Sequence, residues 1–175
     1  MQTVKQRAKK IKLLLLDVDG VLTDGRIIYD NQGRDLKVFD VHDGMGIYLL
    51  SKLGIKTILI SARSSGTIHK RAKDMSVYKV FENAQPKSRV LETILKSLKI
   101  KSSQVCFVGD DLVDLCLMRR VGLSVAVKNS CPQIKSHAHY ITKKTGGRGA
   151  VREVTELILK AQGKWAKAVE SYLKQ

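Results

Sequence analysis

Two aspartates near the start of the chain stand where they could do chemistry. The apolar run Ile11–Leu16 ends in Asp17, and Asp19 follows two residues later. Such a run, ended by a polar residue, is typical of a buried parallel strand. Carboxylates just past the end of a strand can point into one pocket, where they repel each other unless a cation neutralises them. One of them could attack phosphorus, and the other could protonate the leaving oxygen and later deprotonate water.

Three further predicted strands also lead into polar residues. The strands lie near residues 57–60, 78–81 and 105–108, and they are followed by Ser61, by Lys87 after a loop, and by Asp110 with Asp111. Because ligands of a parallel sheet bind beyond the carboxyl ends of its strands, we expect these groups to converge. The two later aspartates would complete an oxygen-rich shell of the kind that Mg²⁺ prefers, and the serine and lysine would hold phosphate oxygens. The convergence predicts Mg²⁺-dependent phosphoryl transfer.

The elements that would position these residues form an alternating pattern. Strands near 11–16, 57–60, 78–81, 105–108, 123–127 and 140–141 alternate with helices over 45–53, 65–74, 87–98, 112–120 and 150–161. This alternation predicts an α/β fold with a doubly wound, Rossmann-like parallel sheet. One insertion interrupts it: residues 26–29 and 36–39 are prone to form strands, and Asp30-Asn31-Gln32-Gly33 between them predicts a small β-hairpin.

The composition is that of one basic domain. The chain has 175 residues, of which 43% are hydrophobic and 27% charged, enough to bury a full core. We expect a single domain over 1–175, with a basic N-terminal arm at 1–10 and a C-terminal tail at about 162–175. Lysine and arginine number 32 against 16 acids, a net charge of +16. Most of the acidic residues lie within 17–43 and 110–114. Such clustering predicts a cation-binding site, and the basic residues elsewhere in the chain would attract an anion to it.

The cysteines and the hydropathy favour a cytoplasmic location. The three cysteines form no CxxC pair, as expected of free thiols in a reducing compartment. The apolar run after the basic start is too short for a signal peptide, and no stretch approaches the roughly 20 apolar residues of a membrane span. We therefore predict a cytoplasmic protein without a membrane partner.

Three other classes of protein are less well matched. A signalling receiver domain combines acids, a hydroxyl and a lysine, but its phosphorylated aspartate follows the acidic pair by a whole βα unit, whereas Asp17 precedes Asp19. A nucleic-acid end phosphatase or binding protein would explain the charge, yet the basic residues are dispersed and only 5% of residues are aromatic. We therefore expect no nucleic-acid partner. A catalytically silent subunit is disfavoured because every chemical position is filled.

Four motifs resemble those of the haloacid dehalogenase superfamily of phosphatases. They are Asp17-Val18-Asp19-Gly20-Val21-Leu22-Thr23-Asp24, Ser61, Lys87 and Gly109-Asp110-Asp111-Leu112-Val113-Asp114. Further segments are similar to the 3-deoxy-D-manno-octulosonate 8-phosphate phosphatase branch: Val41–Ile47, Ser61-Ala62-Arg63 and Thr145-Gly146-Gly147-Arg148-Gly149-Ala150-Val151-Arg152-Glu153. The resemblance runs from about Ile11 to Gly163. It implies hydrolysis of this sugar-acid phosphate, in lipopolysaccharide precursor synthesis, through an aspartyl-phosphate intermediate.

The resemblance also implies a role for each motif residue. Asp17 would be the nucleophile, and Asp19 would be the general acid and base, whose backbone carbonyl also binds Mg²⁺. The phosphate would be held by Ser61 and Lys87. The metal site would be formed by Asp17, Asp19, Asp110 and Asp111, with Asp114 nearby.

Substrate contacts are implied in the same way. They map onto Asp19, Asp40, Val41, His42, Asp43, Gly44, Tyr48, Arg63, Arg71, Lys87 and Arg148. The branch often has Asn, Arg and Arg where this chain has Asp40, His42 and Tyr48. This chain could therefore act instead on a nine-carbon sialic-type acid phosphate. A nucleic-acid end phosphatase is a more distant alternative.

The superfamily's cap domains lie between the first and second motifs or between the second and third. Segments 20–60 and 62–86 are filled by the elements described above, so no cap domain is expected. The resemblance implies a homotetramer with hairpins packed at its centre, and a neighbour's glycine-rich segment covering the site. The flexibility of Gly146–Gly149 and the charge of Arg148 suit such a cover, and a plain loop before a helix is the alternative.

Overall fold

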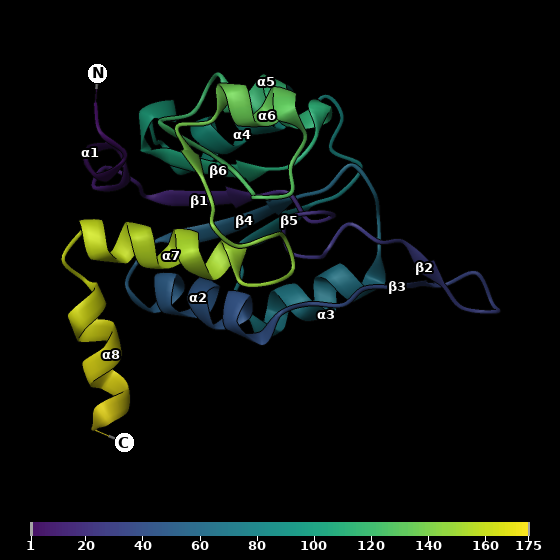
Figure 1. Cartoon of the computed structure of the whole chain (residues 1–175), viewed down its shortest axis with the longest axis horizontal. Coiled ribbons are helices and arrows are strands. Elements are labelled where there is room, and N and C mark those ends of the chain that lie inside the picture. Colours follow the sequence, from purple (N-terminus) through teal and green to yellow (C-terminus); the bar gives the residue numbers. More distant parts are fainter. Residues whose placement is uncertain (1, 175) are drawn as a thin grey trace.

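A six-stranded parallel sheet forms the centre of the molecule (Figure 1). The computed structural model describes residues 2–174. The strand order is β5–β4–β1–β6–β7–β8, and every neighbouring pair is parallel. The bounds are β1 Leu13–Leu16, β4 Lys56–Ile60, β5 Lys79–Phe81, β6 Val105–Gly109, β7 Leu123–Ala126 and β8 Tyr140–Ile141. The predicted doubly wound α/β fold is confirmed, with β1, the strand of the first motif, in the middle.

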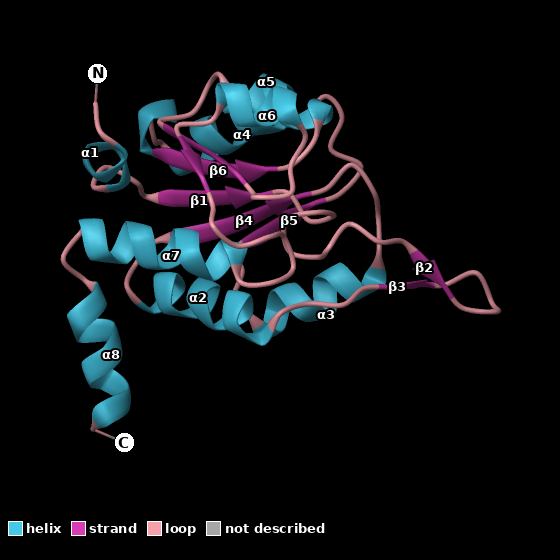
Figure 2. Ribbon diagram, in the orientation of Figure 1, coloured by secondary structure: helices cyan, strands magenta, loops and turns pink. Residues whose placement is uncertain are grey.

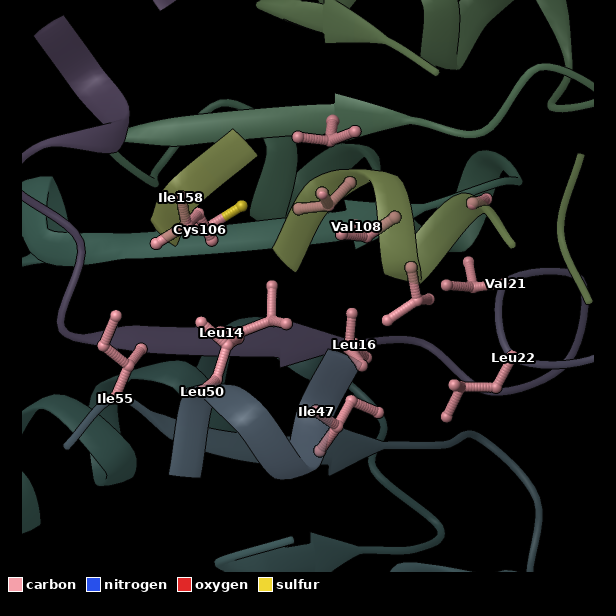
Figure 3. Packing of buried hydrophobic residues seen from close by; sticks show 14 of the residues in the cluster. Leu14, Leu16, Val21, Leu22, Ile47, Leu50, Ile55, Cys106, Val108 and Ile158 are labelled. Atoms are coloured by element: carbon pink, nitrogen blue, oxygen red, sulfur yellow. The ribbon is translucent and has the colours of Figure 1, made fainter. Parts of the chain in front are cut away.

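Helices cover both faces of the sheet (Figure 2). One face carries α2 (Val41–Lys52), α3 (Gly66–Asp74) and α7 (Ala150–Ala161), and the other α4 (Lys87–Leu98), α5 (Leu115–Met118) and α6 (Pro132–His137). Side chains of a strand point alternately to its two faces. Leu14 and Leu16 accordingly pack in the core with α2 and α7 (Figure 3), whereas Leu13 and Leu15 pack in a second core with Leu91 of α4. This burial on both faces explains the unbroken apolar run of β1.

Two helices differ from the sequence prediction at their beginnings. α2 begins four residues earlier than predicted, because the Asp40 carboxylate accepts hydrogen bonds from the backbone N–H groups of His42 and Asp43 and so caps the helix. The predicted helix over 112–120 is divided into a 3₁₀ turn, η2 (Leu112–Asp114), and the short α5. Asp114 lies at this junction, and its side chain is buried towards the carboxyl end of β6.

The predicted hairpin is present as β2 (Ile28–Tyr29) and β3 (Asp35–Leu36). Asp30 closes its turn: its carboxylate accepts hydrogen bonds from the backbone of Gln32 and Arg34, and the Arg34 guanidinium lies 2.6 Å away. The hairpin projects beyond the carboxyl ends of the strands (Figure 1). It exposes several large apolar side chains, of Ile27, Ile28, Tyr29, Leu36 and Val38.

Both terminal regions contain helices. α1 (Val4–Ala8) is held by a capping box of Thr3 and Gln6, and it contacts α7 with Ala8 fully buried. The basic arm therefore contacts the domain through α1, while most of its side chains are exposed. α8 (Trp165–Leu173) follows α7. Within residues 2–174, no helix combines the length and the apolar character needed to cross a membrane.

Candidate active site

The buried ammonium group of Lys87 joins residues from three different elements. Its Nζ donates hydrogen bonds to the carboxylates of Asp17, at 2.5 Å, and Asp114, at 2.6 Å. Asp17 directly follows β1, Asp114 ends η2 after β6, and Lys87 is the first residue of α4 after β5. All three side chains are buried. The expected convergence at the carboxyl ends of the strands is thus present in the structure.

Three carboxylates at this point are arranged to hold a cation. Asp17, Asp110 and Asp114 each offer an oxygen, and these oxygens lie within 4.8 Å of one another. Asp111 is exposed, and its carboxylate accepts a hydrogen bond from the N–H of Leu112 at 2.8 Å. The geometry therefore adds Asp114, which the sequence places only nearby, to the group of three, and the role of Asp111 as a metal ligand stays a prediction.

The electrostatics of the cluster also fit a divalent cation. Burial and the neighbouring Asp114 carboxylate raise the pKa of Asp17 to about 8. Burial, followed by the Asp114 and Asp111 charges, raises the pKa of Asp110 to about 7. Carboxylates crowded at low dielectric favour their neutral forms unless positive charge is added. Lys87 supplies one positive charge to three carboxylates, and the hard oxygen donors that remain are those that Mg²⁺ prefers.

Glycines let the loop after β1 lie against this cluster. Gly20 has φ +93°, and a Cβ there would lie 2.0 Å from a carboxylate oxygen of Asp110. A Cβ on Gly146 would lie 1.7 Å from the carbonyl oxygen of Gly20. Only residues without a side chain allow these close approaches. The glycine-rich segment therefore packs behind the loop that carries Asp19.

Ser61 directly follows β4, and hydrogen bonds hold it in place. Its N–H donates to the Phe81 carbonyl, its carbonyl accepts from Ala84, and its hydroxyl oxygen accepts from the N–H of Arg63 at 3.0 Å. The side chain is buried. The hydroxyl hydrogen remains available to donate to a phosphate oxygen, as the predicted role requires.

The hairpin brings a lysine to Asp19 that the sequence analysis missed. Lys37 Nζ lies 2.5 Å from the Asp19 carboxylate and 3.5 Å from that of Asp35, and its side chain is only 5% exposed. Nearby, the Arg63 guanidinium donates to the Tyr29 hydroxyl at 2.9 Å. The alternation of Asp35, Lys37 and Phe39 after the turn is a weak signal that Lys37 faces the domain. A contact 18 positions away in the sequence cannot be read from that signal alone.

Several of the predicted substrate contacts cluster around the start of α2. Val41 and His42 are exposed there, beside the helix-capping Asp40. The Arg71 guanidinium donates a hydrogen bond to the Asp40 carbonyl at 3.1 Å. A Cβ on Gly44 would lie 2.3 Å from a nitrogen of this guanidinium. Gly44 therefore leaves the room that the arginine occupies.

Asp43 is buried beneath this helix start. Its carboxylate accepts hydrogen bonds from the N–H groups of Arg152, at 2.7 Å, and Gly149, at 3.3 Å. Burial is the main cause that raises the pKa of Asp43 to about 6. These contacts make Asp43 an anchor between α2 and the start of α7, and its role as a substrate contact stays a prediction.

Two predicted contacts lie away from this group. Tyr48 is on the third turn of α2, where it lines a hollow of about 290 Å³ between α2 and α8. Arg148 is exposed in the glycine-rich segment. The backbone of that segment is held by hydrogen bonds in its own chain: Gly146 donates to the Asn129 side chain and Gly147 to the Val21 carbonyl. That the segment of a neighbouring copy covers the site stays a prediction. In its own chain it is a loop before α7, fixed by hydrogen bonds and close packing.

Comparison with known proteins points to one family. A model of haloacid dehalogenase-like hydrolases matches residues 65–154. A 3-deoxy-D-manno-octulosonate 8-phosphate phosphatase of Yersinia pestis is 44% identical over 161 residues, which are 92% of this chain and 86% of that protein. The corresponding enzyme of Escherichia coli K12 is 42% identical over 158 residues, 90% of this chain and 84% of that protein.

Solved structures agree over nearly the whole chain. A probable phosphatase of the yrbi family from Pseudomonas syringae has a TM-score of 0.95 and 44% identity, and the match covers 97% of both chains. A 3-deoxy-D-manno-octulosonate 8-phosphate phosphatase from Moraxella catarrhalis, in complex with magnesium ion, phosphate ion and KDO, has a TM-score of 0.94 and 42% identity, again over 97% of both chains.

Proposed function

The chain belongs to the haloacid dehalogenase-like hydrolases, in the family of the 3-deoxy-D-manno-octulosonate 8-phosphate phosphatases, and we propose that it hydrolyses that sugar-acid phosphate to the free sugar acid and phosphate. It is a Mg²⁺-dependent phosphoric monoester hydrolase. The observation that carries the chemistry is the buried Lys87 ammonium between Asp17 and Asp114, with Asp110 alongside.

The first half of the reaction uses two aspartates. An oxygen of Asp17 attacks phosphorus, so that a bond from Asp17 to phosphorus forms while the bond from phosphorus to the sugar oxygen breaks. The Asp19 carboxyl gives its proton to the departing sugar oxygen. Asp19 is the better placed for this step, because its carboxylate lies at the hairpin side and is partly exposed, whereas Asp17 is buried in the cluster.

The second half restores the enzyme. Asp19, now a carboxylate, takes a proton from water as the water oxygen attacks the phosphorus of the aspartyl-phosphate. The bond from Asp17 to phosphorus breaks, and phosphate leaves. Ser61 and Lys87 hold the phosphate oxygens in both halves and offset the charge that develops on them.

The carboxylates of Asp17, Asp110 and Asp114 would hold the Mg²⁺, together with the backbone carbonyl of Asp19. When bound, Mg²⁺ neutralises these carboxylates and the phosphate oxygens that approach them. The three acidic side chains are contributed by β1 and by the segment after β6, so the sheet itself fixes their spacing.

A phosphate-release screen tests the substrate. The purified protein with Mg²⁺ is assayed on 3-deoxy-D-manno-octulosonate 8-phosphate, a nine-carbon sialic-type acid 9-phosphate, hexose phosphates and nucleic-acid ends. We expect kcat/KM for the eight-carbon acid to exceed the others by on the order of 10²-fold, or about 3 kcal/mol. A preference for the nine-carbon acid would instead support the second candidate, which stays open because Asp40, His42 and Tyr48 depart from the family pattern.

Asp17→Asn is the control for the mechanism. It should abolish turnover on every ester while the circular dichroism spectrum stays unchanged, because the amide keeps the shape of the side chain but is not a nucleophile. Turnover like that of the wild type in this variant would rule out the aspartyl-phosphate.

The exposed hairpin supports assembly of several copies through β2 and β3. Its apolar side chains are 43–66% exposed, a large apolar surface on a projecting element. Four copies meeting through these hairpins would bury this surface. Light scattering of the wild type and of Ile28→Lys tests this assembly. We expect a wild-type tetramer that dissociates in the variant, and a wild-type monomer would contradict the proposal.

We also propose a cytoplasmic location. The free thiols of Cys106, Cys116 and Cys131 agree with a reducing compartment.

A further inference from the structure

A second charged hollow lies at the end of the sheet opposite the catalytic residues. It opens between the amino ends of β1, β4 and β6 and the junction of α7 with α8, which lies on the left in Figure 1. Its volume is about 630 Å³. We call it the amino-end cavity. Its lining comprises Lys9, Lys10, Ile11, Lys12, Gly54, Ile55, Lys101, Ser103, Gln104, Gln162 and Lys164.

The charge of this cavity is of one sign. Five of its lining residues are lysines and none is acidic. Within residues 2–174, none of these five lysines forms an ion pair. An adjoining hollow of about 620 Å³ shares Lys9, Gln162 and Lys164 with it and adds Lys5 and Lys160. Like charges this close repel one another, and an anion bound among them would relieve that repulsion.

The frame of the amino-end cavity is rigid. The Gln162 side-chain amide donates to the carbonyls of Ile11, at 2.8 Å, and Ala8, at 3.3 Å, and so ties the end of α7 to the start of β1. Lys164 Nζ donates to the carbonyl of Leu53, at the end of α2. Capping of a helix end thus accounts for Lys164. The ammonium groups of Lys9, Lys10 and Lys12 have no such partner among the described residues, and these lysines are exposed, so an anion can reach them from solvent.

We propose that the amino-end cavity binds a small oligophosphate, either free or as part of a nucleoside triphosphate. The cavity volume falls within the roughly 300–1,000 Å³ of small-molecule sites. Lysines bind phosphate as flexible point charges, and several of them can surround one chain of phosphoryl groups. No aromatic side chain lines the cavity, so there is no platform on which a base could stack. The phosphate chain is therefore the part of the ligand that is recognised.

Two triple variants with the same net charge test this site. The first, Lys10→Gln with Lys12→Gln and Lys101→Gln, removes three lysines of the amino-end cavity. The control replaces three exposed lysines elsewhere, on α3, α4 and α8: Lys73→Gln with Lys96→Gln and Lys167→Gln. Both should keep the wild-type kcat, because none of the six lysines is near the catalytic cluster. That assay also shows that each variant is folded.

Binding of tripolyphosphate is then measured by calorimetry at fixed ionic strength, with divalent cations removed. We expect the wild type and the control to bind equally and the cavity variant to bind at least about 10-fold more weakly. Equal binding by all three proteins would place the anion elsewhere and overturn the proposal. So would the lack of wild-type binding at millimolar tripolyphosphate.

Further ligands identify the source of the phosphate chain. ATP that binds as tightly as tripolyphosphate, with the same loss in the cavity variant, would assign the site to nucleotides. Weaker binding of ATP would assign it to free condensed phosphate. If single-stranded nucleic acid or anionic vesicles bind the wild type and not the cavity variant, while tripolyphosphate binds neither, the surface serves a macromolecule and the oligophosphate proposal is wrong.

Discussion

Asp114 and Asp111 show how a side chain's direction decides its role at the residue scale. Both follow β6, yet Asp114 is fully buried against Lys87 whereas Asp111 is exposed and caps its own turn. The buried position is held on two sides, because the second Asp114 oxygen accepts from the N–H of Asp110 at 3.0 Å. Asp114 thus joins the backbone of Asp110, a proposed Mg²⁺ ligand, to Lys87, which we propose holds the phosphate.

We predict that Asp114→Asn weakens Mg²⁺ activation far more than Asp111→Asn does. The loss of one charged ligand from the group of three should raise the Mg²⁺ concentration for half-maximal activity by about 10–100-fold. The exposed Asp111 should change it by less than about threefold. Titration of activity with Mg²⁺ in the two variants measures the difference. A larger effect in Asp111→Asn would mean that its carboxylate turns inwards when the metal is bound.

Lys37 carries the second prediction at this scale. Its ammonium group fixes the orientation of Asp19, the proposed general acid, from the side of the hairpin. Lys37→Met keeps the length and apolar stem but removes this ion pair, and we expect kcat to fall by on the order of 10-fold with little change in KM. The exposed Arg34→Met, on the same hairpin, is the matched control. Steady-state kinetics that show an unchanged kcat in Lys37→Met would contradict this positioning role.

Among the helices and strands, α2 and α7 make the most extensive contact with each other, and Asp43 lies within this contact. The pKa of Asp43 rises from an ordinary 3.8 to about 6 in the folded protein. A group whose pKa is raised by folding adds stability that is complete below its unfolded pKa and is lost as the pH rises through the folded value. Ionisation of Asp43 therefore lowers the free energy of unfolding between about pH 4 and pH 7.

Asp43→Asn should remove this dependence. The wild type, relative to the variant, should lose up to about 3 kcal/mol of unfolding free energy across that range, since one pKa unit corresponds to about 1.4 kcal/mol. Urea unfolding of both proteins at pH 4, 5, 6 and 7 provides the measurement. Parallel curves would show that the hydrogen bonds from Arg152 and Gly149 keep Asp43 ionised throughout.

At the scale of the whole molecule, the charge of +16 surrounds a site made of carboxylates. Such a field attracts an anionic substrate over distances that salt screens, with a Debye length of about 10 Å at 0.1 M. We predict that kcat/KM falls by roughly tenfold between low and high ionic strength while kcat changes little. The assay holds free Mg²⁺ constant. A flat response would show that the basic surface does not steer the substrate.

The residue order alone is enough to predict where the strands end and therefore where the chemically active groups gather. Apolar runs that stop at Asp17, Ser61 and Asp110 must form buried parallel strands, and the carboxyl ends of such strands meet at one edge. The turn residues between the two hairpin segments likewise determined the insertion. These features depend on local patterns, which a single chain carries in its own residue order.

Only the tertiary structure decided which side chains meet. Lys37 reaches Asp19, Asp114 joins Asp17 at Lys87, and Gly146 packs on Gly20, because long-range packing brings these residues together. The same packing puts Lys9, Lys10 and Lys12 beside Lys101 and Lys164 in the amino-end cavity. Contacts between residues far apart in the chain depend on how the elements fill space together, and no local pattern specifies that.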